Sequence, residues 1–342
     1  MTTRIAVLGC GFYARNHLRS WRDLAPEGAE IVGVCDLDPA RAEAAGQEFG
    51  APAFTDPGEM VHATSPALVD VVTRADGHRS LAEALAPRVG GLIVQKPFAP
   101  TLADARAIVA AARSAGTWLA VHENFRWQPP LRRAIRLLDD GAIGRPSWAR
   151  VSFRTGWDVY ATQPYFLTEE RLAIADVGVH VLDLCRRMLG EVDRLSAETQ
   201  QRNPRLRGED TATMLLRHVS GAVSLAECTY ESRRQPDRFP ETLAEVEGPG
   251  GALAVLPGGA IELTRGGRME RIPPDFAFAP WMEPRWAMSQ AGCLDCCRHL
   301  LGSFQAGRPA ETSGDDNLAT AALVEAAYAA AAAGQPRRPE AT

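Results

Sequence analysis

Residues 4–14 read RIAVLGCGFYA, a short apolar run followed directly by a turn with two glycines and an alanine. Gly9, Gly11 and Ala14 match the GxGxxG/A pattern, in which a strand turns sharply into a helix. Glycine permits the tight turn and lets backbone N–H groups approach a pyrophosphate at the helix N-terminus. A glycine-rich turn can also be an ordinary connection. The stretch therefore predicts a strand, a turn and a helix, and the ligand must be argued from other residues.

Asp36 supplies the second signal for dinucleotide binding. It follows another β-branched run, residues 30–35, where an acidic side chain accepts hydrogen bonds from the adenine ribose hydroxyls. Its carboxylate repels a 2′-phosphate, and Leu37 offers no cation to accept one. Arg41 is either a phosphate contact or an exposed residue of the next helix. We therefore expect NAD as the cofactor, with NADP less favoured.

The first third of the chain alternates β-branched runs with helical patterns, which is typical of a parallel sheet flanked by helices. Thr101 can cap a helix that ends at Gly116. This alternation predicts an α/β Rossmann domain over residues 1–124. Its expected strands are residues 4–8, 30–35, 68–73, 91–95 and 118–122.

From residue 147 the pattern changes to longer alternating strands with glycine-rich turns between them. We expect an α+β domain over residues 125–334 with a large, mostly antiparallel open sheet, which serves substrate binding and oligomerisation. We expect a final alanine-rich helix over about 317–333, with packing back on the Rossmann domain as one option. The clearest strands are residues 211–218, 221–230 and 243–247, and a further helix is expected over residues 174–189.

Composition bounds the partners. Of the 342 residues, 46% are hydrophobic and 23% charged, and the formal net charge is -5 with no run of Lys or Arg. Such a balance indicates neither nucleic acid nor an acidic membrane as a partner. No stretch of about 20 apolar residues is present. We expect a soluble cytoplasmic protein whose partners are small molecules.

The seven cysteines are an odd number, which fits reduced thiols in the cytosol rather than a disulfide framework. Cys293, Cys296 and Cys297 lie close together, with His299 nearby, and could be read as a metal site. Their flanking sequence is helical, however, and zinc sites normally draw their ligands from two separated pairs. Packing is the favoured interpretation, and no metal is predicted.

Several spaced motifs together resemble the Gfo/Idh/MocA oxidoreductases, the family of glucose-fructose oxidoreductase and inositol dehydrogenase. They are GCGFYA at residues 9–14, Asp36, His78, QKPFAP at 95–100 and DVGVHVLD at 176–183. The family usually has EKP where this chain has Gln95, so only Lys96 and Pro97 carry over from that motif. The expected cofactor site comprises Gly9, Gly11, Phe12, Tyr13, Ala14, Asp36, Thr73, His78, Gln95 and Lys96.

Oxidation of a carbinol needs a base with a near-neutral pKa and a donor that favours alkoxide-like charge. His180 and Lys96 can supply these two groups. On a helix, Asp176 and Asp183 share a face with His180, so a carboxylate could orient the imidazole or join it at the substrate. Taken singly, such a histidine is usually structural and such a lysine solvated. The resemblance implies Lys96, Asp176 and His180 as the catalytic residues, with His180 as the base.

Two segments have the mixture of hydrogen-bonding and aromatic groups that suits a sugar. HENFRWQPP, at 122–130, leaves the last expected Rossmann strand at its carboxyl end, where open α/β sheets bind ligands. RTGWDVYATQPYF, at 154–166, has the same character, although both segments could be loops packed between domains. The expected substrate-binding residues are Lys96, Asn124, Arg126, Trp127, Arg154, Trp157, Tyr165, Asp176 and His180.

We therefore predict an NAD-dependent dehydrogenase that oxidises a sugar or polyol hydroxyl. QKPFAP, HENFRWQP and QPYF resemble the D-apiose dehydrogenase-like branch of the family, which implies an aldose or pentose as substrate. Two alternatives remain: an enzyme that uses NAD transiently to cleave glycosidic bonds, and a non-catalytic sensor of sugars or dinucleotides. The presence of both Lys96 and His180 disfavours the sensor.

The expected strands 211–218 and 221–230 carry apolar or small residues on both faces. This is more apolar surface than one layer of helices can cover. Packing on a symmetry mate is the simplest way to keep such a sheet soluble, so we expect a homodimer or homotetramer. The alternative is that residues 317–333 and a loop near 273–286 shield this face within one chain.

Overall fold

The computed structural model describes residues 2–237 and 239–342, which form two compact units. The first unit comprises Met1–Asn124 and Cys293–Ala321, and the second comprises Phe125–Gly292 and Ala322–Thr342. Two long helices, α8 (Ala287–Gln305) and α9 (Gly314–Ala333), each contribute residues to both units. Within the described part of the chain, every helix is too short or too polar to cross a membrane.

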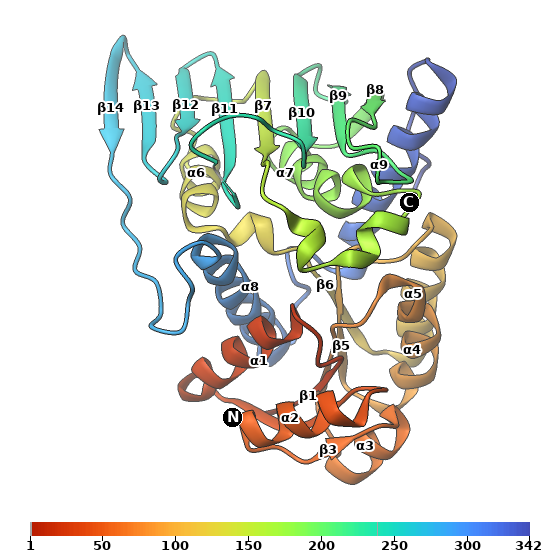
Figure 1. Ribbon diagram of the computed structural model, residues 1–342. Helices are drawn as coiled ribbons and strands as arrows, with labels where there is room; N and C mark the ends of the chain where they lie inside the picture. Colours follow the sequence, from red (N-terminus) through yellow and green to blue (C-terminus); the bar gives the residue numbers. More distant parts are fainter. Residues whose placement is uncertain (1, 238) are drawn as a thin grey trace. The chain divides into compact units, whose positions relative to one another are not determined.

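The first unit contains a six-stranded parallel sheet in the order β3-β2-β1-β4-β5-β6 (Figure 1). This confirms the predicted Rossmann-type sheet, and the strand order reverses between β1 and β4, where open α/β sheets bind ligands. The two-residue β3 was not expected from the sequence. The strands are β1 (Thr3–Leu8), β2 (Ala29–Cys35), β3 (Ala53–Phe54), β4 (Leu68–Val71), β5 (Gly91–Gln95) and β6 (Trp118–His122).

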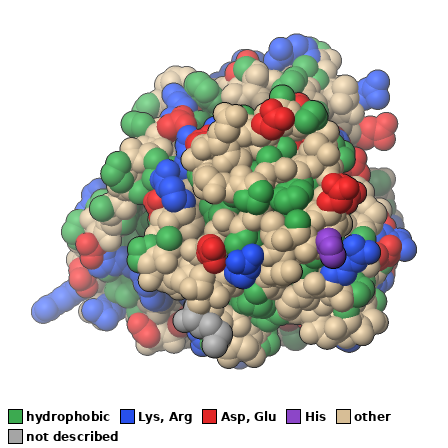
Figure 2. Space-filling model, turned by 90° about the horizontal axis from the view of Figure 1, so that it is seen from below, with side chains coloured by type: hydrophobic (Ala, Val, Ile, Leu, Met, Phe, Trp, Pro, Cys, Tyr) green, Lys and Arg blue, Asp and Glu red, His purple; other side chains and the backbone are tan. Residues whose placement is uncertain are grey.

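Five helices connect these strands. In α5, the Thr101 hydroxyl accepts the Asp104 N–H at 3.1 Å, and the helix ends at Gly116 with φ 69°, as the sequence predicts. Viewed from below Figure 1, where α2 and α3 lie, acidic and basic side chains are interspersed (Figure 2). The helices are α1 (Ala14–Asp23), α2 (Pro39–Phe49), α3 (Pro57–Thr64), α4 (His78–Leu85) and α5 (Leu102–Ala115).

Residues from near the C-terminus cover the outer edge of β6. The Val121 N–H donates to the Thr312 carbonyl at 2.8 Å, and the Thr312 hydroxyl donates to the Val121 carbonyl at 2.8 Å. Ala120 also forms an antiparallel bridge with Ser313. The last strand of the parallel sheet therefore has hydrogen-bond partners on both sides.

The second unit contains an eight-stranded sheet in the order β14-β13-β12-β11-β7-β10-β9-β8. Neighbouring strands are antiparallel except β7 and β10, which confirms the predicted mostly antiparallel sheet. The strands are β7 (Trp148–Arg154), β8 (Val192–Gln200), β9 (Thr211–His218), β10 (Val223–Thr229), β11 (Thr242–Gly248), β12 (Gly251–Val255), β13 (Ile261–Arg265) and β14 (Arg268–Ile272).

Two helices, α6 (Pro129–Asp139) and α7 (Val179–Leu189), pack on one face of this sheet and bury its alternate side chains (Figure 1). The regular helix expected over 174–189 is wrong in its first turn, because Ile174–Gly178 forms a π-helical turn before α7. Side chains distant in sequence bind this entry: the Ile174 N–H donates to Glu209 at 3.0 Å, and the Ala175 N–H to the Tyr328 hydroxyl at 3.2 Å. Local periodicity cannot reveal such partners.

Candidate active site

The turn between β1 and α1 has the backbone that a dinucleotide phosphate requires. Gly9 has φ +97°, and a Cβ there would lie 2.4 Å from the Val72 carbonyl oxygen, so only glycine fits. A Cβ on Gly11 would meet no heavy atom of the described residues within 4 Å, apart from its chain neighbours. The start of α1 is therefore open at Gly11, where a pyrophosphate can approach the N–H groups. Phe12 is exposed, and the Tyr13 hydroxyl accepts a hydrogen bond from Asn124 at 3.0 Å.

Asp36 lies at the end of β2 beside this turn. Its carboxylate accepts the Cys10 N–H at 2.7 Å and the Asp38 N–H at 2.9 Å, which fixes its orientation. Leu37 is exposed, and the Arg41 guanidinium pairs with Asp38 at 3.3 Å. The site thus presents the fixed carboxylate of Asp36, while the nearby guanidinium of Arg41 is paired with Asp38. That arrangement favours ribose hydroxyls over a 2′-phosphate.

His78 is buried and bridges two backbone segments. One ring nitrogen lies 3.1 Å from the Thr73 carbonyl oxygen and the other 3.1 Å from that of Phe98. Burial lowers the pKa of the His78 imidazole, and the backbone hydrogen bonds oppose this shift only in part. His78 thereby ties the segment after β4 to the segment that follows Lys96.

Lys96 follows β5, and its peptide bond to Pro97 is cis. Its backbone N–H donates to the Gln95 side-chain oxygen at 2.6 Å, while the Gln95 amide nitrogen lies 2.8 Å from His17 Nε2. His17 Nδ1 in turn lies 2.8 Å from Asp70. Burial raises the pKa of the Asp70 carboxyl, but His17 overcomes this and holds the pKa below its ordinary value. An amide can donate to a neutral imidazole where a carboxylate cannot, so Gln95 suits His17 as its neighbour.

In the second unit, His180 is buried on α7 and stacks on Phe125, with ring centroids 3.7 Å apart and an interplanar angle of 3°. Asp176 lies on the π-helical turn and accepts a hydrogen bond from the Tyr230 hydroxyl. Burial, followed by the Asp176 charge, raises the pKa of Tyr230 well above its ordinary value. Tyr230 therefore remains a neutral donor that holds Asp176 in place.

Arg126 and Asp183 form a buried ion pair, with two N–O distances of 2.6 Å. A buried guanidinium needs such a partner, because an unpaired charge in the interior is costly. Asp183 is thus bound to Arg126, although the helical spacing suggested that it could orient His180. The pair ties the segment of Phe125 to α7.

Three of the predicted substrate residues are aromatic, and their side chains differ in burial and in neighbours. Trp127 is buried, with the Arg132 guanidinium 5.5 Å from its ring centroid, and the Arg285 guanidinium lies 3.9 Å from that of Trp157. The Tyr165 side chain is exposed, and its hydroxyl donates to Gln163 at 2.8 Å. These aromatic groups all lie on the connections before α6 and after β7.

Within the second unit, Arg154 lies on the face of the sheet opposite His180, contrary to its predicted role in substrate binding. Its side chain is exposed and pairs with Glu227 at 3.2 Å. Because side chains alternate along a strand, Arg154 faces away from the core side, where neighbouring Phe153 lies 5.9 Å from Phe125 between ring centroids.

The sequence did not predict the residues that contact the predicted site residues and keep their side chains in place. Phe125 lies inside the quoted segment 122–130 and Tyr230 ends an expected strand, but neither was among the predicted site residues. Their roles as the platform under His180 and the donor to Asp176 depend on contacts between distant segments. The hydrogen bonds that link Gln95 to His17 and His17 to Asp70 were not predicted either, because buried polar contacts produce no periodic pattern in the sequence.

Both units have counterparts among known proteins. Residues 3–123 match a family described as "Oxidoreductase family, NAD-binding Rossmann fold", and residues 131–254 match the GFO/IDH/MocA C-terminal domain. A protein of Paraburkholderia graminis named D-apiose dehydrogenase is 46% identical over 336 residues, which cover 96% of this chain and 88% of that protein. A D-apiose dehydrogenase of Rhizobium rhizogenes is 40% identical over 96% of this chain and 95% of its own length.

Among solved structures, an oxidoreductase from Agrobacterium radiobacter in complex with NAD+, L-tartaric acid and magnesium has a TM-score of 0.96. It is 39% identical in sequence, and the match covers 99% of this chain and 98% of that chain.

Proposed function

The chain belongs to the Gfo/Idh/MocA family of NAD-binding oxidoreductases, and on this premise we propose that it oxidises D-apiose or a closely related aldose with NAD. The observation that carries the substrate is the 46% identity to a protein named D-apiose dehydrogenase over 96% of this chain. The open turn at Gly11 and the fixed Asp36 support the cofactor.

The residues of the first unit fit NAD. The N–H groups after Gly9 would hold the pyrophosphate, and Asp36 would accept the adenine ribose hydroxyls. Phe12, Tyr13, Thr73 and the segment tied by His78 would complete the site. Bound NAD supplies the hydride acceptor.

The protein's own part in the reaction is to handle a proton. We assign the base to His180, which takes the hydroxyl proton while Phe125 fixes the plane of its ring. Lys96 donates to the substrate oxygen as negative charge develops there, and Gln95 holds its backbone. Asp176, held by Tyr230, is assigned to binding the sugar hydroxyls with the segments around Asn124 and Trp157.

We also propose that the protein is cytoplasmic and works as a homodimer or homotetramer. All seven cysteines are buried free thiols, which suits a reducing compartment. The sheet face opposite α7 carries Leu215, which is 54% exposed and pairs across strands with Leu225. This apolar pair supports contact with a second copy of the chain.

The decisive experiment is steady-state kinetics with NAD on D-apiose, other aldoses and myo-inositol, followed by NADH absorbance. We expect a kcat/KM for D-apiose at least about 10²-fold above that for myo-inositol, because unpaired polar groups in a site reject the wrong hydroxyl pattern. A preference for the inositol would contradict the proposal.

Product analysis separates the possible reactions. Oxidation at the anomeric carbon gives a lactone, whose hydrolysis releases a second proton for each NADH, whereas oxidation at another carbon releases one. A glycoside-cleaving enzyme that uses NAD transiently would accumulate no NADH. Simultaneous proton and NADH measurements, with NMR of the product, therefore distinguish the three reactions.

A further inference from the structure

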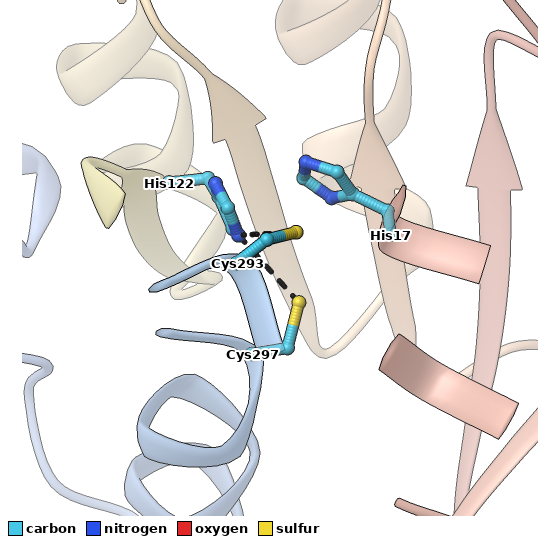
Figure 3. Close-up of side chains that lie close together, drawn as sticks. All are labelled: His17, His122, Cys293 and Cys297. Carbon is cyan, nitrogen blue, oxygen red and sulfur yellow. Dashed lines mark hydrogen bonds between the residues drawn. The ribbon is translucent and has the colours of Figure 1, made fainter. Parts of the chain in front are cut away.

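Four potential metal ligands meet inside the first unit (Figure 3). They are His17 from α1, His122 from the end of β6, and Cys293 and Cys297 from α8. All four side chains are 0% exposed, and one ligand atom from each lies within 4.8 Å of the others. The dehydrogenase reaction proposed above uses none of these four groups directly.

We propose that His17, His122, Cys293 and Cys297 bind a single structural zinc ion. His122 Nε2 lies 3.5 Å from Cys297 Sγ and 3.7 Å from Cys293 Sγ. Tetrahedral zinc, with Zn–S of about 2.3 Å and Zn–N of about 2.0 Å, places its nitrogen and sulfur ligands roughly 3.5 Å apart. Both distances from His122 Nε2 to sulfur are thus close to the nitrogen–sulfur edge of a zinc tetrahedron.

Helix geometry explains why two cysteines of α8 can bind the same ion. Cys293 and Cys297 are four residues apart on α8, so they project from the same face of the helix. Cys296 is equally buried but lies outside the cluster, and the His299 ring accepts the Glu311 N–H at 3.0 Å. The histidine near the cysteines in sequence is therefore not the one near them in space. This is why the local pattern suggested packing alone.

His17 would complete the site with a carboxylate behind it. Asp70 and Gln95 each bind one of its ring nitrogens, so a metal must replace one of these hydrogen bonds. Keeping the bond to Asp70 gives the carboxylate–histidine–zinc arrangement that is common around metals. The Asp70 carboxylate also accepts the Trp21 indole N–H at 2.7 Å, which holds it in position.

The surroundings favour a cation. Asp70 Oδ1 and His122 Nδ1 are buried and have no hydrogen-bond partner among the described residues. A buried carboxylate with an unsatisfied oxygen is costly, and a divalent ion nearby offsets that negative charge. Two thiolates neutralise the ion, and a closed site of two sulfurs and two nitrogens matches zinc better than calcium, magnesium or manganese.

The test is metal analysis of the full chain, reduced and incubated with Zn²⁺, then freed of loose metal by gel filtration. We expect about one zinc per chain in the wild type and at most about a tenth of that in Cys293→Ala and Cys297→Ala. Cys296→Ala is the matched control, because it removes a buried thiol from the same helix outside the cluster, and it should retain the ion.

Cobalt gives a second readout that needs no variant. The wild-type protein loaded with Co²⁺ should show thiolate-to-cobalt charge transfer and strong visible bands of a tetrahedral site. Three results would overturn the proposal: a wild type without zinc, another metal in its place, or equal zinc in the two cysteine variants and the control. Octahedral cobalt without thiolate absorption would do the same.

Discussion

At the scale of single residues, the plane of the His180 ring is fixed before any substrate arrives. Phe125 lies parallel to it at 3.7 Å, and Arg126, next in the chain, is paired with Asp183 on the same helix. A proton acceptor must keep its lone pair aimed at the reacting hydroxyl. The stacked Phe125 ring and the nearby Arg126–Asp183 ion pair therefore support the proposed role of His180 as proton acceptor.

We predict that His180→Ala and Lys96→Ala each lower kcat by about 10²-fold or more, because acid–base groups act mainly in the transition state. The Kd for NAD should change by less than about threefold, since the turn at Gly11 and Asp36 are untouched. Steady-state kinetics and a fluorescence titration measure the two quantities. His62→Ala, which removes an exposed histidine from α3, is the control. Normal turnover in either active-site variant would remove that residue from the mechanism.

At the scale of elements, the two glycines of the β1–α1 turn differ in why a side chain is absent. Gly9 is required by its positive φ and by the Val72 carbonyl, whereas a side chain at Gly11 meets open space. The fold therefore requires glycine at position 9, whereas at position 11 the proposed reason for glycine is the approach of the NAD pyrophosphate.

This difference predicts opposite phenotypes for one added methyl group. Gly11→Ala should leave the free energy of unfolding within about 0.5 kcal/mol of the wild type but weaken NAD binding about tenfold or more. Gly9→Ala should lower the free energy of unfolding by several kcal/mol, because both backbone conformation and packing oppose the methyl. Denaturant titration and NAD titration of both variants check the pair. Unchanged NAD affinity in Gly11→Ala would contradict the placement of the pyrophosphate.

A buried histidine connects three elements of the second unit. His218, at the end of β9, lies 2.7 Å from the Gly190 carbonyl oxygen after α7 through Nδ1 and 2.8 Å from the Ser224 hydroxyl on β10 through Nε2. The neutral ring satisfies both, donating at Nδ1 and accepting at Nε2. Burial lowers the pKa of this imidazole.

Because the folded-state pKa of His218 is lower, the unfolded chain takes up the proton first as the pH falls below about 6.5. Stability should therefore decline between pH 7 and pH 5, with this residue adding at most about 1.4 kcal/mol per pH unit. His218→Gln should flatten the decline in the free energy of unfolding, measured by denaturant titration at each pH. The control is His62→Gln on α3. An identical slope in wild type and His218→Gln would contradict the assignment.

Sequence reasoning predicted elements where the signal is local. Thr101 and Gly116 mark the ends of α5, and alternation in residues 211–218 marks β9, because caps and periodicity involve neighbours in the chain. The π-helical turn before α7 depends on Glu209 and Tyr328, and the positions of Phe125 and Tyr230 depend on tertiary contacts. Such features appear only when distant segments are brought together.

At the scale of the whole molecule, the eight-stranded sheet of the second unit has one covered face and one open face. Ala212, Met214 and Leu216 of β9 are buried on the side of α7, while Leu215 between them is exposed. Around the apolar pair of Leu215 and Leu225 lie ion pairs of Glu227 with arginines of β7. Apolar side chains with ion pairs beside them are consistent with the proposed contact with a second copy of the chain.

We predict that Leu215→Asp weakens self-association about tenfold or more, because it places a charge in that apolar centre. Val219→Asp is the control, since Val219 is 72% exposed in the turn between β9 and β10 and off the sheet face. Sedimentation at micromolar concentration measures the masses. A wild type of monomer mass, or equal dissociation in both variants, would reject the interface.

The covering of β6 by residues 312–313 has a consequence for the order in which the sheet can be completed during synthesis. All six strands of the parallel sheet lie within residues 3–122, but the residues that pair with the outer edge of β6 follow only at 312–313. At about 5–20 residues per second, synthesis of the intervening residues takes roughly 10 to 40 s, during which the unpaired edge of β6 can recruit other chains. A chain that stops before residue 312 would lack the partners of this edge, so we expect such a truncation to promote aggregation.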